Sequence, residues 1–332
     1  MQDTSNYCFI ENKARNECYP REAVERVAPK LYRKLIEHEA NCKISELPRP
    51  FQVNKQHIVY CPLCVQRLAS LRDFMPDSVN DANDEIIRTV GVIGFGNFGA
   101  FFAKNLAVWF DVTAWDAINL STKAESLGVC WGTLAQAARS DLVILAVTLD
   151  ALEGILRELG SCLNSGALVM DVCSVKEEPI RLMKKYLSNE VELLGTHPLF
   201  GPQSARDGMQ GHRIIICPIT PRSPKVDYLL DFFQQRCLNI TEMSAKEHDR
   251  EMAVVQGLTH FIARALAECG IQSSECTTQA FDHLYTVMAL LGNDSWEVFK
   301  TIQVGNAFAP DIRHQFVTKL VSLEIRLAQG QS

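Results

Sequence analysis

Two polar side chains follow apolar, strand-like segments, and their chemistry suits the oxidation of an alcohol. His197 ends the segment VELLGTH and is followed by Pro198 and a loop rich in Gly, Pro and Ser, whereas Ser174 ends the segment ALVMDVCS. A neutral imidazole titrates near neutral pH and can accept a hydroxyl proton while hydride leaves the adjoining carbon. Because parallel sheets bind ligands beyond the carboxyl ends of their strands, His197 and Ser174 are candidate catalytic residues, with the serine orienting the alcohol.

Each of these residues also has a structural interpretation. Ser174 could cap a helix that is expected to begin near Lys176, since serine is among the preferred N-cap residues. His197 could satisfy a backbone carbonyl group at the strand end. The segments that surround them in the chain favour the catalytic interpretation.

A glycine-rich segment upstream predicts a dinucleotide site. The stretch VGVIGFGNFG places Gly94, Gly96 and Gly99 in the pattern GxGxxG, after an apolar strand and before the helical run FGAFFAKNLAVWF. Gly94 permits the tight turn, Gly96 lets the backbone approach a pyrophosphate, and Gly99 lets the helix pack on the strand. Backbone N–H groups at the helix start would then face the phosphates.

The next strand-like segment, VTAWD, ends in an acid that indicates the type of dinucleotide. A carboxylate at Asp116 would bind the ribose hydroxyls and repel a 2′-phosphate, so the sequence favours NAD over NADP. The other residues expected at the cofactor lie in the glycine loop and at the end of the segment DLVILAVT: Phe95, Asn97, Phe98, Val147 and Thr148.

Strand-like and helix-like segments alternate through the middle of the chain. The expected strands are RTVGVIG, DVTAWD, DLVILAVT, ALVMDVCS, VELLGTH and RIIICP, and the expected helices cover residues 98–109, 134–139, 149–159 and 176–187. This alternation is typical of a parallel sheet with helices on both faces. We therefore expect an α/β fold: a doubly wound Rossmann-type domain at 87–221, an all-helical substrate and dimerisation domain at 222–332, and a short N-terminal extension at 1–86. From about 225 onward the pattern is almost wholly helical, and its longest run covers residues 245–268.

Composition excludes several other classes of protein. The chain has 332 residues and a formal net charge of −6, which argues against a general nucleic-acid surface. No apolar run reaches the roughly 18 residues of a membrane helix. The start, MQDTSNYCFIENKARN, lacks an apolar signal core and contains acidic residues, so we expect a cytoplasmic protein. Its 12 cysteines are scattered, which indicates reduced thiols rather than a disulfide framework.

Four segments in order resemble the prephenate and arogenate dehydrogenase family of tyrosine biosynthesis: GFGNFG, DVCSVKEEP, THPLFGPQSARDG and AKEHDREMAVVQGLTHF. The resemblance covers about residues 88 to 330. It implies oxidative decarboxylation of prephenate or arogenate with hydride transfer to NAD, and a homodimer formed by the helical domain. It also implies that His197 accepts a hydrogen bond from the ring hydroxyl, that Ser174 contacts the same hydroxyl and the nicotinamide, and that His260 approaches the substrate's side chain.

The chain departs from the family pattern where many relatives carry an arginine for the ring carboxylate. The corresponding stretch reads AFDHLY, so Arg264, one helical turn beyond His260, and His283 are the candidate replacements. In the loop after His197, Gln203 and Ser204 are expected to contact the substrate. Relatives often have an acidic residue where this chain has the neutral Gln203, which favours prephenate, although Asp207 could compensate. The segment GFGNFG and the C-terminal region resemble plant-type arogenate dehydrogenases and favour arogenate, and on balance we expect a slight preference for prephenate.

The N-terminal residues do not fit the family core, and their role is open. Some relatives carry a fused chorismate mutase on this side, but prolines interrupt the long helices which that enzyme needs. Cys61 and Cys64 form one CxxC pair, which is half of a zinc site that Cys42 and His38 could complete. Free thiols on a small extension are the favoured interpretation, and no metal is expected to take part in the chemistry.

Two other functions fit part of the pattern. A β-hydroxyacid dehydrogenase also joins a dinucleotide domain to a helical domain, but it relies on a lysine where this chain offers His260. A non-catalytic dinucleotide-binding protein would need neither Ser174 nor His197.

Overall fold

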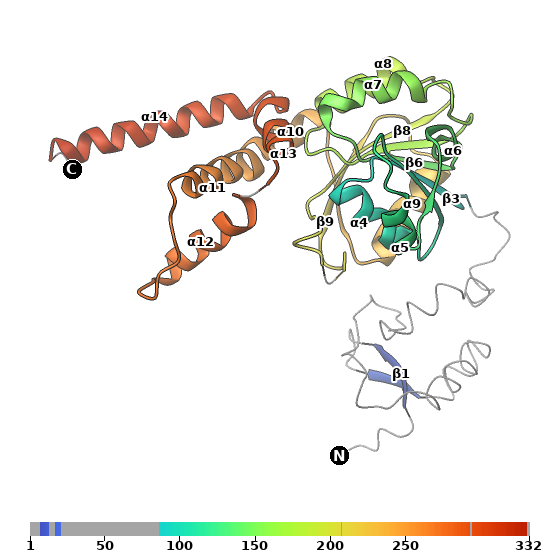
Figure 1. The fold of residues 1–332 in the computed structure, drawn as a ribbon, viewed down its shortest axis with the longest axis horizontal. Coiled ribbons are helices and arrows are strands. Elements are labelled where there is room, and N and C mark those ends of the chain that lie inside the picture. Colours follow the sequence, from blue (N-terminus) through green and yellow to red (C-terminus); the bar gives the residue numbers. More distant parts are fainter. Residues whose placement is uncertain (1–6, 13–16, 21–85, 207, 293, 331–332) are drawn as a thin grey trace.

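The computed structural model describes residues 7–12, 17–20, 86–206, 208–292 and 294–330. Most of these residues form an α/β domain from which a helical arm extends (Figure 1). Strands β1 (Tyr7–Asn12) and β2 (Glu17–Pro20) pair antiparallel in a separate two-stranded sheet. The zinc ligands considered from the sequence, which include Cys61 and Cys64, lie outside the described residues.

The α/β domain is built on one eight-stranded sheet with the order β10-β9-β8-β7-β6-β3-β4-β5. Neighbouring strands are parallel except β8 and β9, which are antiparallel. All six strands expected from the sequence are present. The strands are β3 (Thr89–Ile93), β4 (Asp111–Trp115), β5 (Cys130–Trp131), β6 (Leu142–Leu145), β7 (Leu168–Asp171), β8 (Glu192–Pro198), β9 (Arg213–Pro218) and β10 (Asn239–Glu242).

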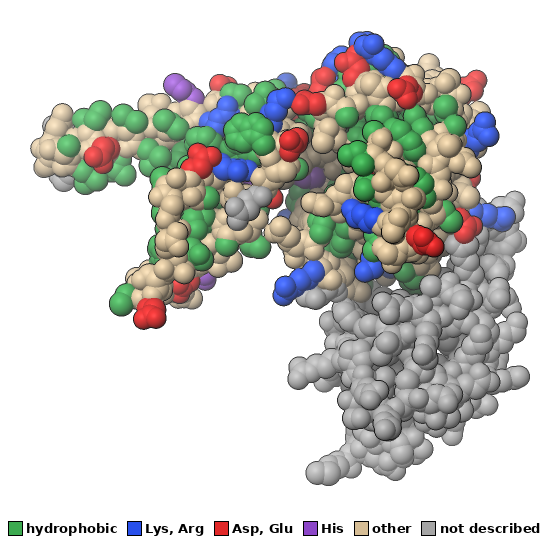
Figure 2. Space-filling model, viewed as in Figure 1, with side chains coloured by type: hydrophobic (Ala, Val, Ile, Leu, Met, Phe, Trp, Pro, Cys, Tyr) green, Lys and Arg blue, Asp and Glu red, His purple; other side chains and the backbone are tan. Residues whose placement is uncertain are grey.

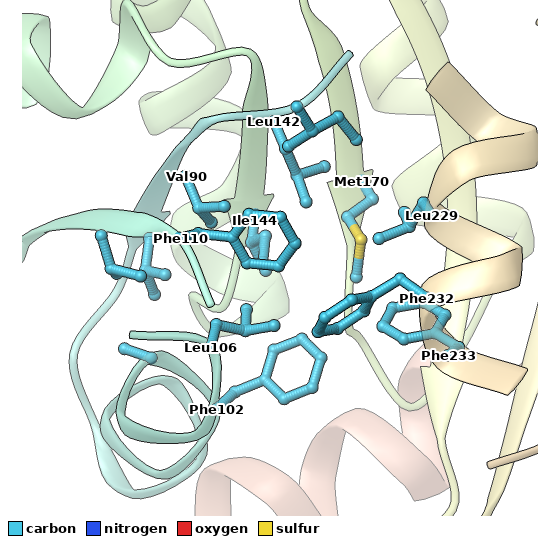
Figure 3. Packing of buried hydrophobic residues seen from close by; sticks show 14 of the residues in the cluster. Val90, Phe102, Leu106, Phe110, Leu142, Ile144, Met170, Leu229, Phe232 and Phe233 are labelled. Atoms are coloured by element: carbon cyan, nitrogen blue, oxygen red, sulfur yellow. The ribbon is translucent and has the colours of Figure 1, made fainter. Parts of the chain in front are cut away.

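Helices cover both faces of this sheet, as the alternating pattern predicts. Because side chains alternate along a strand, Leu142 and Ile144 of β6 enter the core beneath α4 and α9, whereas Val143 and Leu145 enter the core beneath α7 and α8. Figure 3 shows the first of these cores, where Phe102 and Phe233 meet between the helices and the sheet. The covering helices are α4 (Asn97–Leu106), α5 (Ser121–Ser126), α6 (Leu134–Ala138), α7 (Leu149–Leu159), α8 (Glu177–Tyr186) and α9 (Pro224–Gln235).

The sheet continues beyond the boundary expected at residue 221. Helix α9 begins at Pro224 with Ser223 as its cap and buries Leu229, Leu230 and Phe233 in the core of the α/β domain. Strand β10 then pairs parallel with β9. The expectation that the chain is helical from about 225 onward is therefore wrong for β10, whose short, half-exposed sequence NITE carries little strand signal.

The helical arm begins at Ala245, and its first run agrees with the helix expected over 245–268. That run contains a π-helical stretch, η5, and a second one, η6, precedes the last helix; such stretches often occur at functional sites. The arm consists of α10 (Ala245–Met252), η5 (Ala253–Leu258), α11 (Thr259–Glu268), α12 (Gln279–Leu291), α13 (Trp296–Lys300), η6 (Thr301–Gly305) and α14 (Ala309–Ala328). None of the described helices is long and apolar enough to cross a membrane.

The arm contacts the α/β domain at the carboxyl edge of the sheet. Lys300 of α13 forms an ion pair with Asp150 of α7, with 2.7 Å between Nζ and Oδ2. A side chain at Gly305 would lie 2.7 Å from Leu149, so η6 packs closely against the start of α7. Figure 2 shows the surface hollowed between the arm and the α/β domain. The junction therefore lies beside the edge where the predicted site residues lie.

Candidate active site

The glycine loop has the geometry that the sequence predicts. Gly94 adopts a φ of +95°, which L side chains rarely adopt. A Cβ at Gly99 would lie 2.0 Å from the carbonyl oxygen of Gly94, so only glycine lets α4 approach the strand this closely. Gly96 is exposed, and a Cβ added to it would meet no other atom within 4 Å. The first turn of α4 has no side-chain cap, and its open N–H groups fit a pyrophosphate.

Asp116 follows β4 and lies directly beside this loop. Its Oδ2 accepts the backbone N–H of Phe95 at 2.6 Å, and its Oδ1 accepts that of Ile118 at 3.1 Å. Lys123 donates from Nζ to the carbonyl oxygen of Phe95 at 3.3 Å. The carboxylate expected at the ribose is thus fixed in position by the loop that would hold the pyrophosphate.

The other predicted cofactor residues divide into exposed and buried groups. Asn97 and Thr148 are exposed at the starts of α4 and α7. The Phe95 ring is fully buried against Trp131, so only the backbone of this residue is available to a cofactor. The partly buried Phe98 packs among other phenylalanines, and Val147 packs against the core beneath α7 and α8.

His197 lies near the end of β8 and is buried, with 3% of its surface exposed. Its Nδ1 is 2.8 Å from Nε2 of His248 on α10. Burial, followed by the charges of His248, Lys176 and His260, holds the pKa of His197 well below its usual value. The imidazole is therefore neutral at neutral pH. Its Nδ1 contacts a second histidine and not the backbone carbonyl group that a purely structural role would predict.

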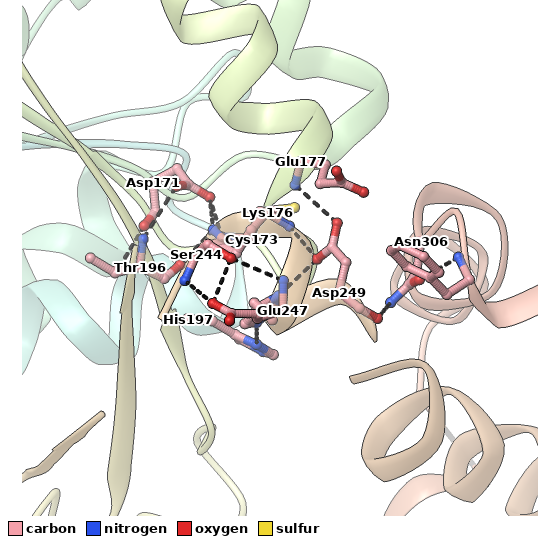
Figure 4. Close-up of polar contacts among 12 residues, drawn as sticks. Asp171, Cys173, Lys176, Glu177, Thr196, His197, Ser244, Glu247, Asp249 and Asn306 are labelled. Carbon is pink, nitrogen blue, oxygen red and sulfur yellow. Dashed lines mark hydrogen bonds and ion pairs between the residues drawn. The ribbon is translucent and has the colours of Figure 1, made fainter. Parts of the chain in front are cut away.

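The helix after β7 is capped by Asp249 and not by Ser174. The Asp249 carboxylate accepts the backbone N–H groups of Lys176 and Glu177, at 2.7 and 2.9 Å, and so satisfies the start of α8 (Figure 4). Ser174 is half-buried in the loop before α8. Because β7 and β8 are parallel neighbours, Ser174 and His197 follow strands that end at the same edge of the sheet.

A buried ion pair lies behind the loop that carries Ser174. The Lys176 ammonium contacts the Asp171 carboxylate and donates to the Thr196 carbonyl oxygen at 2.6 Å. Lys176 is 0% exposed and Asp171 is 1% exposed. The pair joins the ends of β7 and β8, and so holds the two strands that carry Ser174 and His197.

His260 and Arg264 of α11 converge on the segment after α12, as their spacing on one helix face predicts. Nδ1 of His260 lies 3.0 Å from Oδ2 of Asp294 but forms no hydrogen bond with it. Arg264 donates to the backbone carbonyl of Asp294 and stacks over Phe299, with its Cζ 5.1 Å from the ring centroid. His260 lies near enough to His197 to influence its pKa, whereas Arg264 is engaged in holding the Asp294 segment.

The loop after β8 presents the remaining predicted contacts. Gln203 and Ser204 are exposed in a turn, and the Ser204 hydroxyl accepts the backbone N–H of Gly201 at 2.9 Å. No group of three His, Cys, Asp or Glu residues suited to a metal ion occurs in the described part of the chain. No motif in the sequence indicates His248, Asp249 or Asp294 as site residues. The only signal for His248 and Asp249 is their adjacency near the start of a helix whose other residues are largely exposed.

These features define the class of α/β dehydrogenases in which a dinucleotide-binding domain precedes a helical domain. The family model described as prephenate dehydrogenase, nucleotide-binding domain, matches residues 111–241, and the one described as prephenate dehydrogenase, dimerization domain, matches residues 244–332. Together the two matches span more than half of the chain. The protein belongs to the prephenate dehydrogenase family, which includes the arogenate dehydrogenases.

Several curated relatives carry names from this family. Arogenate dehydrogenase 2, chloroplastic, from Arabidopsis thaliana is 31% identical over 221 residues, which are 63% of this chain and 62% of the relative. A probable arogenate/prephenate dehydrogenase from Methanocaldococcus jannaschii is 24% identical over 69% of this chain and 53% of its own length. The chain thus spans less than two thirds of these relatives.

Solved structures share the fold. A prephenate dehydrogenase from A. aeolicus, in complex with hydroxyphenyl propionate and NAD+, has a TM-score of 0.60 and 21% identity over 75% of this chain and 93% of its own. Synechocystis arogenate dehydrogenase has a TM-score of 0.53 and 18% identity over 73% of this chain and 92% of its own. At these identities the likeness shows the fold alone.

Proposed function

We propose that the protein oxidises and decarboxylates a cyclohexadienyl substrate, arogenate or prephenate, to give tyrosine or 4-hydroxyphenylpyruvate. The observation that carries this proposal is a buried, neutral His197 at the sheet edge that also holds the glycine loop. The family membership supports the same reaction. Loss of carbon dioxide makes the ring aromatic, so the protein need only align the reactants and manage one proton.

The residues take distinct roles in this reaction. His197 accepts the proton of the ring hydroxyl, and Ser174 orients that hydroxyl. The loop at Gly94–Gly99 and the start of α4 hold the pyrophosphate of a pyridine dinucleotide, which supplies the hydride acceptor when bound. The open N–H groups and the exposed Gly96 fit this group. The cytoplasmic location expected from the sequence remains a prediction.

NAD is the proposed dinucleotide, and Asp116 is the residue that selects it. A 2′-phosphate would meet the Asp116 carboxylate, which its two backbone hydrogen bonds hold in place. Asp116→Ser is therefore expected to reduce the ratio of kcat/KM for NAD to kcat/KM for NADP by about tenfold or more, since about 1.4 kcal/mol corresponds to a factor of ten. Steady-state kinetics with both cofactors measure this ratio, and a wild-type enzyme that prefers NADP would contradict the assignment.

The side chain of the substrate is proposed to lie against His260 and Asp294. A carboxylate at this place would pair with the ammonium of arogenate, whereas prephenate has a neutral keto group there. This contact outweighs the slight preference for prephenate expected from Gln203, because Gln203 is exposed in its turn. We therefore propose arogenate as the preferred substrate.

Formation of reduced cofactor from arogenate, prephenate and 3-hydroxyisobutyrate, measured in parallel, tests the function. We expect turnover of the first two, with kcat/KM at least about tenfold higher for arogenate, and we expect Asp294→Asn to reduce that ratio. Gln203→Glu, in the exposed loop, serves as the control and is expected to leave the ratio of kcat/KM for arogenate to kcat/KM for prephenate unchanged. Turnover of 3-hydroxyisobutyrate alone would identify a β-hydroxyacid dehydrogenase, and no turnover of any of the three would favour a non-catalytic binding protein.

The helical arm is proposed to form a homodimer. Helix α14 exposes apolar side chains along its length, including Val317, Leu320, Val321 and Leu323. An exposed apolar surface of this extent is typical of an interface, and the arm matches the family's dimerization domain. Light scattering is expected to give twice the chain mass of 37.2 kDa, and Val321→Asp is expected to yield monomers. A monomeric wild-type protein at micromolar concentration would contradict this proposal.

A further inference from the structure

Three buried residues form a chain that leads from the sheet edge into the helical arm. Nδ1 of His197 in β8 lies 2.8 Å from Nε2 of His248 in α10, and Nδ1 of His248 lies 2.7 Å from Oδ1 of Asp249. His248 and Asp249 are each 0% exposed. The proposed reaction assigns a role only to the first of these three residues.

The hydrogen-bond partners determine where each imidazole proton lies. Both oxygens of the Asp249 carboxylate accept backbone N–H groups at the start of α8, so this group is the acceptor and Nδ1 of His248 donates to it. In the neutral ring of His248, Nε2 then carries no proton and accepts from Nδ1 of His197. This leaves Nε2 of His197 without a proton, and so able to accept one from a substrate hydroxyl.

His197 alone is a weak base, because burial and nearby positive charge lower its pKa well below the usual value. A proton held on this ring would stay buried close to the Lys176 ammonium. The proton gains a carboxylate partner if the positive charge moves to His248. The titratable groups that surround His197, His248 and Asp249 are Asp171, Lys176, Glu177, Cys217, Glu247 and His260.

We propose that His248 is a positioning and proton-carrying residue for His197, with Asp249 as the counter-ion of the relay. This inference rests on the proposed function. The substrate O–H bond breaks as its proton moves to Nε2 of His197, while the proton on Nδ1 of His197 moves to Nε2 of His248. The carbon that bears this hydroxyl oxygen releases its hydride to the dinucleotide. When carbon dioxide departs, the electrons of the broken carbon–carbon bond enter the ring, and the relay returns one proton to the phenolate oxygen.

Asp249 also ties the relay to the structure around it. Its backbone carbonyl accepts from Nδ2 of Asn306, at 2.7 Å, in the segment after η6. Its side chain caps α8, which begins shortly after Ser174 in the loop that follows β7. The residue thus connects the base, the loop of the second catalytic candidate and the helical arm.

Nuclear magnetic resonance of the 15N-histidine-labelled protein tests the proton positions without cofactor or substrate. The chain has 8 histidines, and single-histidine variants assign their signals. We expect both His197 and His248 to carry their proton on Nδ1 at neutral pH. A wild-type His197 protonated on Nε2 would overturn the relay.

Kinetics of two variants separate proton carriage from ring orientation. In His248→Gln the side-chain carbonyl oxygen can still accept from Nδ1 of His197 but cannot take its proton, and in His248→Asn the side chain is too short to reach His197. We expect kcat to fall about 10²-fold in the Gln variant and at least as far in the Asn variant. The acidic limb of the kcat profile should move to higher pH in the Gln variant, because the charge of His248, which lowers the pKa of His197 in the wild type, is absent from this variant.

A control variant and separate measurements distinguish a failure of the relay from a failure of the proposed function. Lys246→Gln changes an exposed side chain on the same helix and is expected to leave kcat and its pH profile unchanged. A His248→Gln variant with wild-type kcat, or with reduced kcat and an unmoved acidic limb, would overturn proton carriage by His248. If the wild type turns over neither arogenate nor prephenate, the proposed function fails, while the proton positions still decide the hydrogen-bond chain.

Discussion

His197→Asn is expected to lower kcat by roughly 10²- to 10⁴-fold while leaving the affinity for dinucleotide unchanged. The asparagine amide has no basic nitrogen to accept the substrate proton, whereas the glycine loop that would bind the cofactor belongs to β3 and α4. Steady-state kinetics and cofactor titration by fluorescence measure the two effects. A variant with near wild-type kcat would remove His197 from the mechanism.

The pH dependence of kcat provides a second test of the same residue. Burial and the charges of His248, Lys176 and His260 hold the pKa of His197 below 6.5, so the ring stays neutral as the pH falls through that value. We expect kcat to hold between about pH 7 and 6.5 and to decline only at lower pH. An acidic limb centred above 6.5 would contradict the buried environment of this ring.

The same depressed pKa has a consequence for stability. In the unfolded chain His197 binds a proton near its ordinary pKa, whereas in the folded protein it binds one only at lower pH. The unfolded state therefore takes up more protons in the interval between the two values, and stability falls as the pH decreases through it. His197→Asn should make the free energy of unfolding less dependent on pH in this interval, as measured by urea denaturation.

Lys176→Met is expected to destabilise the protein by about 3–5 kcal/mol at neutral pH, because it leaves the Asp171 carboxylate buried without a cation. Both members of this pair are almost completely buried, and Lys176 also donates to the Thr196 carbonyl oxygen. Urea denaturation followed by circular dichroism measures the change. A loss of less than about 1 kcal/mol in the free energy of unfolding is typical of a surface ion pair and would contradict this prediction.

The loss in Lys176→Met should depend on pH in a defined direction. Burial raises the pKa of Asp171, and the Lys176 ammonium opposes that rise. Without the ammonium, the folded protein binds a proton at Asp171 at a pH where the unfolded chain has already released it. The stability of the variant is then highest below the unfolded pKa and falls as the pH rises through the folded one, so its deficit should grow from acidic to neutral pH.

A second substitution serves as the control for this pair. Asp171→Asn in the Lys176→Met background removes the buried charge, and it is expected to recover much of the lost stability. The amide can still accept the backbone N–H of Cys173, which the carboxylate accepts at 3.0 Å in the wild type. A double variant no more stable than the single one would show that packing, and not the uncompensated charge, causes the loss.

The sequence by itself determined the parts of this protein whose signal is local. Gly94 and Gly99 stand where a tight turn and a close helix contact exclude any side chain, so the dinucleotide loop could be predicted from spacing. The strands of the buried sheet are continuous apolar runs, and the family segments placed His197 and Ser174 at its carboxyl edge. The helix pattern likewise predicted the start and length of the run over 245–268.

Only the tertiary structure decided which distant side chains meet. Asp249 accepts the backbone N–H of a residue that lies 73 positions earlier in the chain, and His248 reaches His197 across 51 residues. Such contacts leave no periodic signal, because they depend on how α10 packs beside α8 and β8. The antiparallel direction of β9 and the short strand β10 depend in the same way on pairing within the sheet. The sequence could name the candidate base, whereas the side chains that contact it follow from packing.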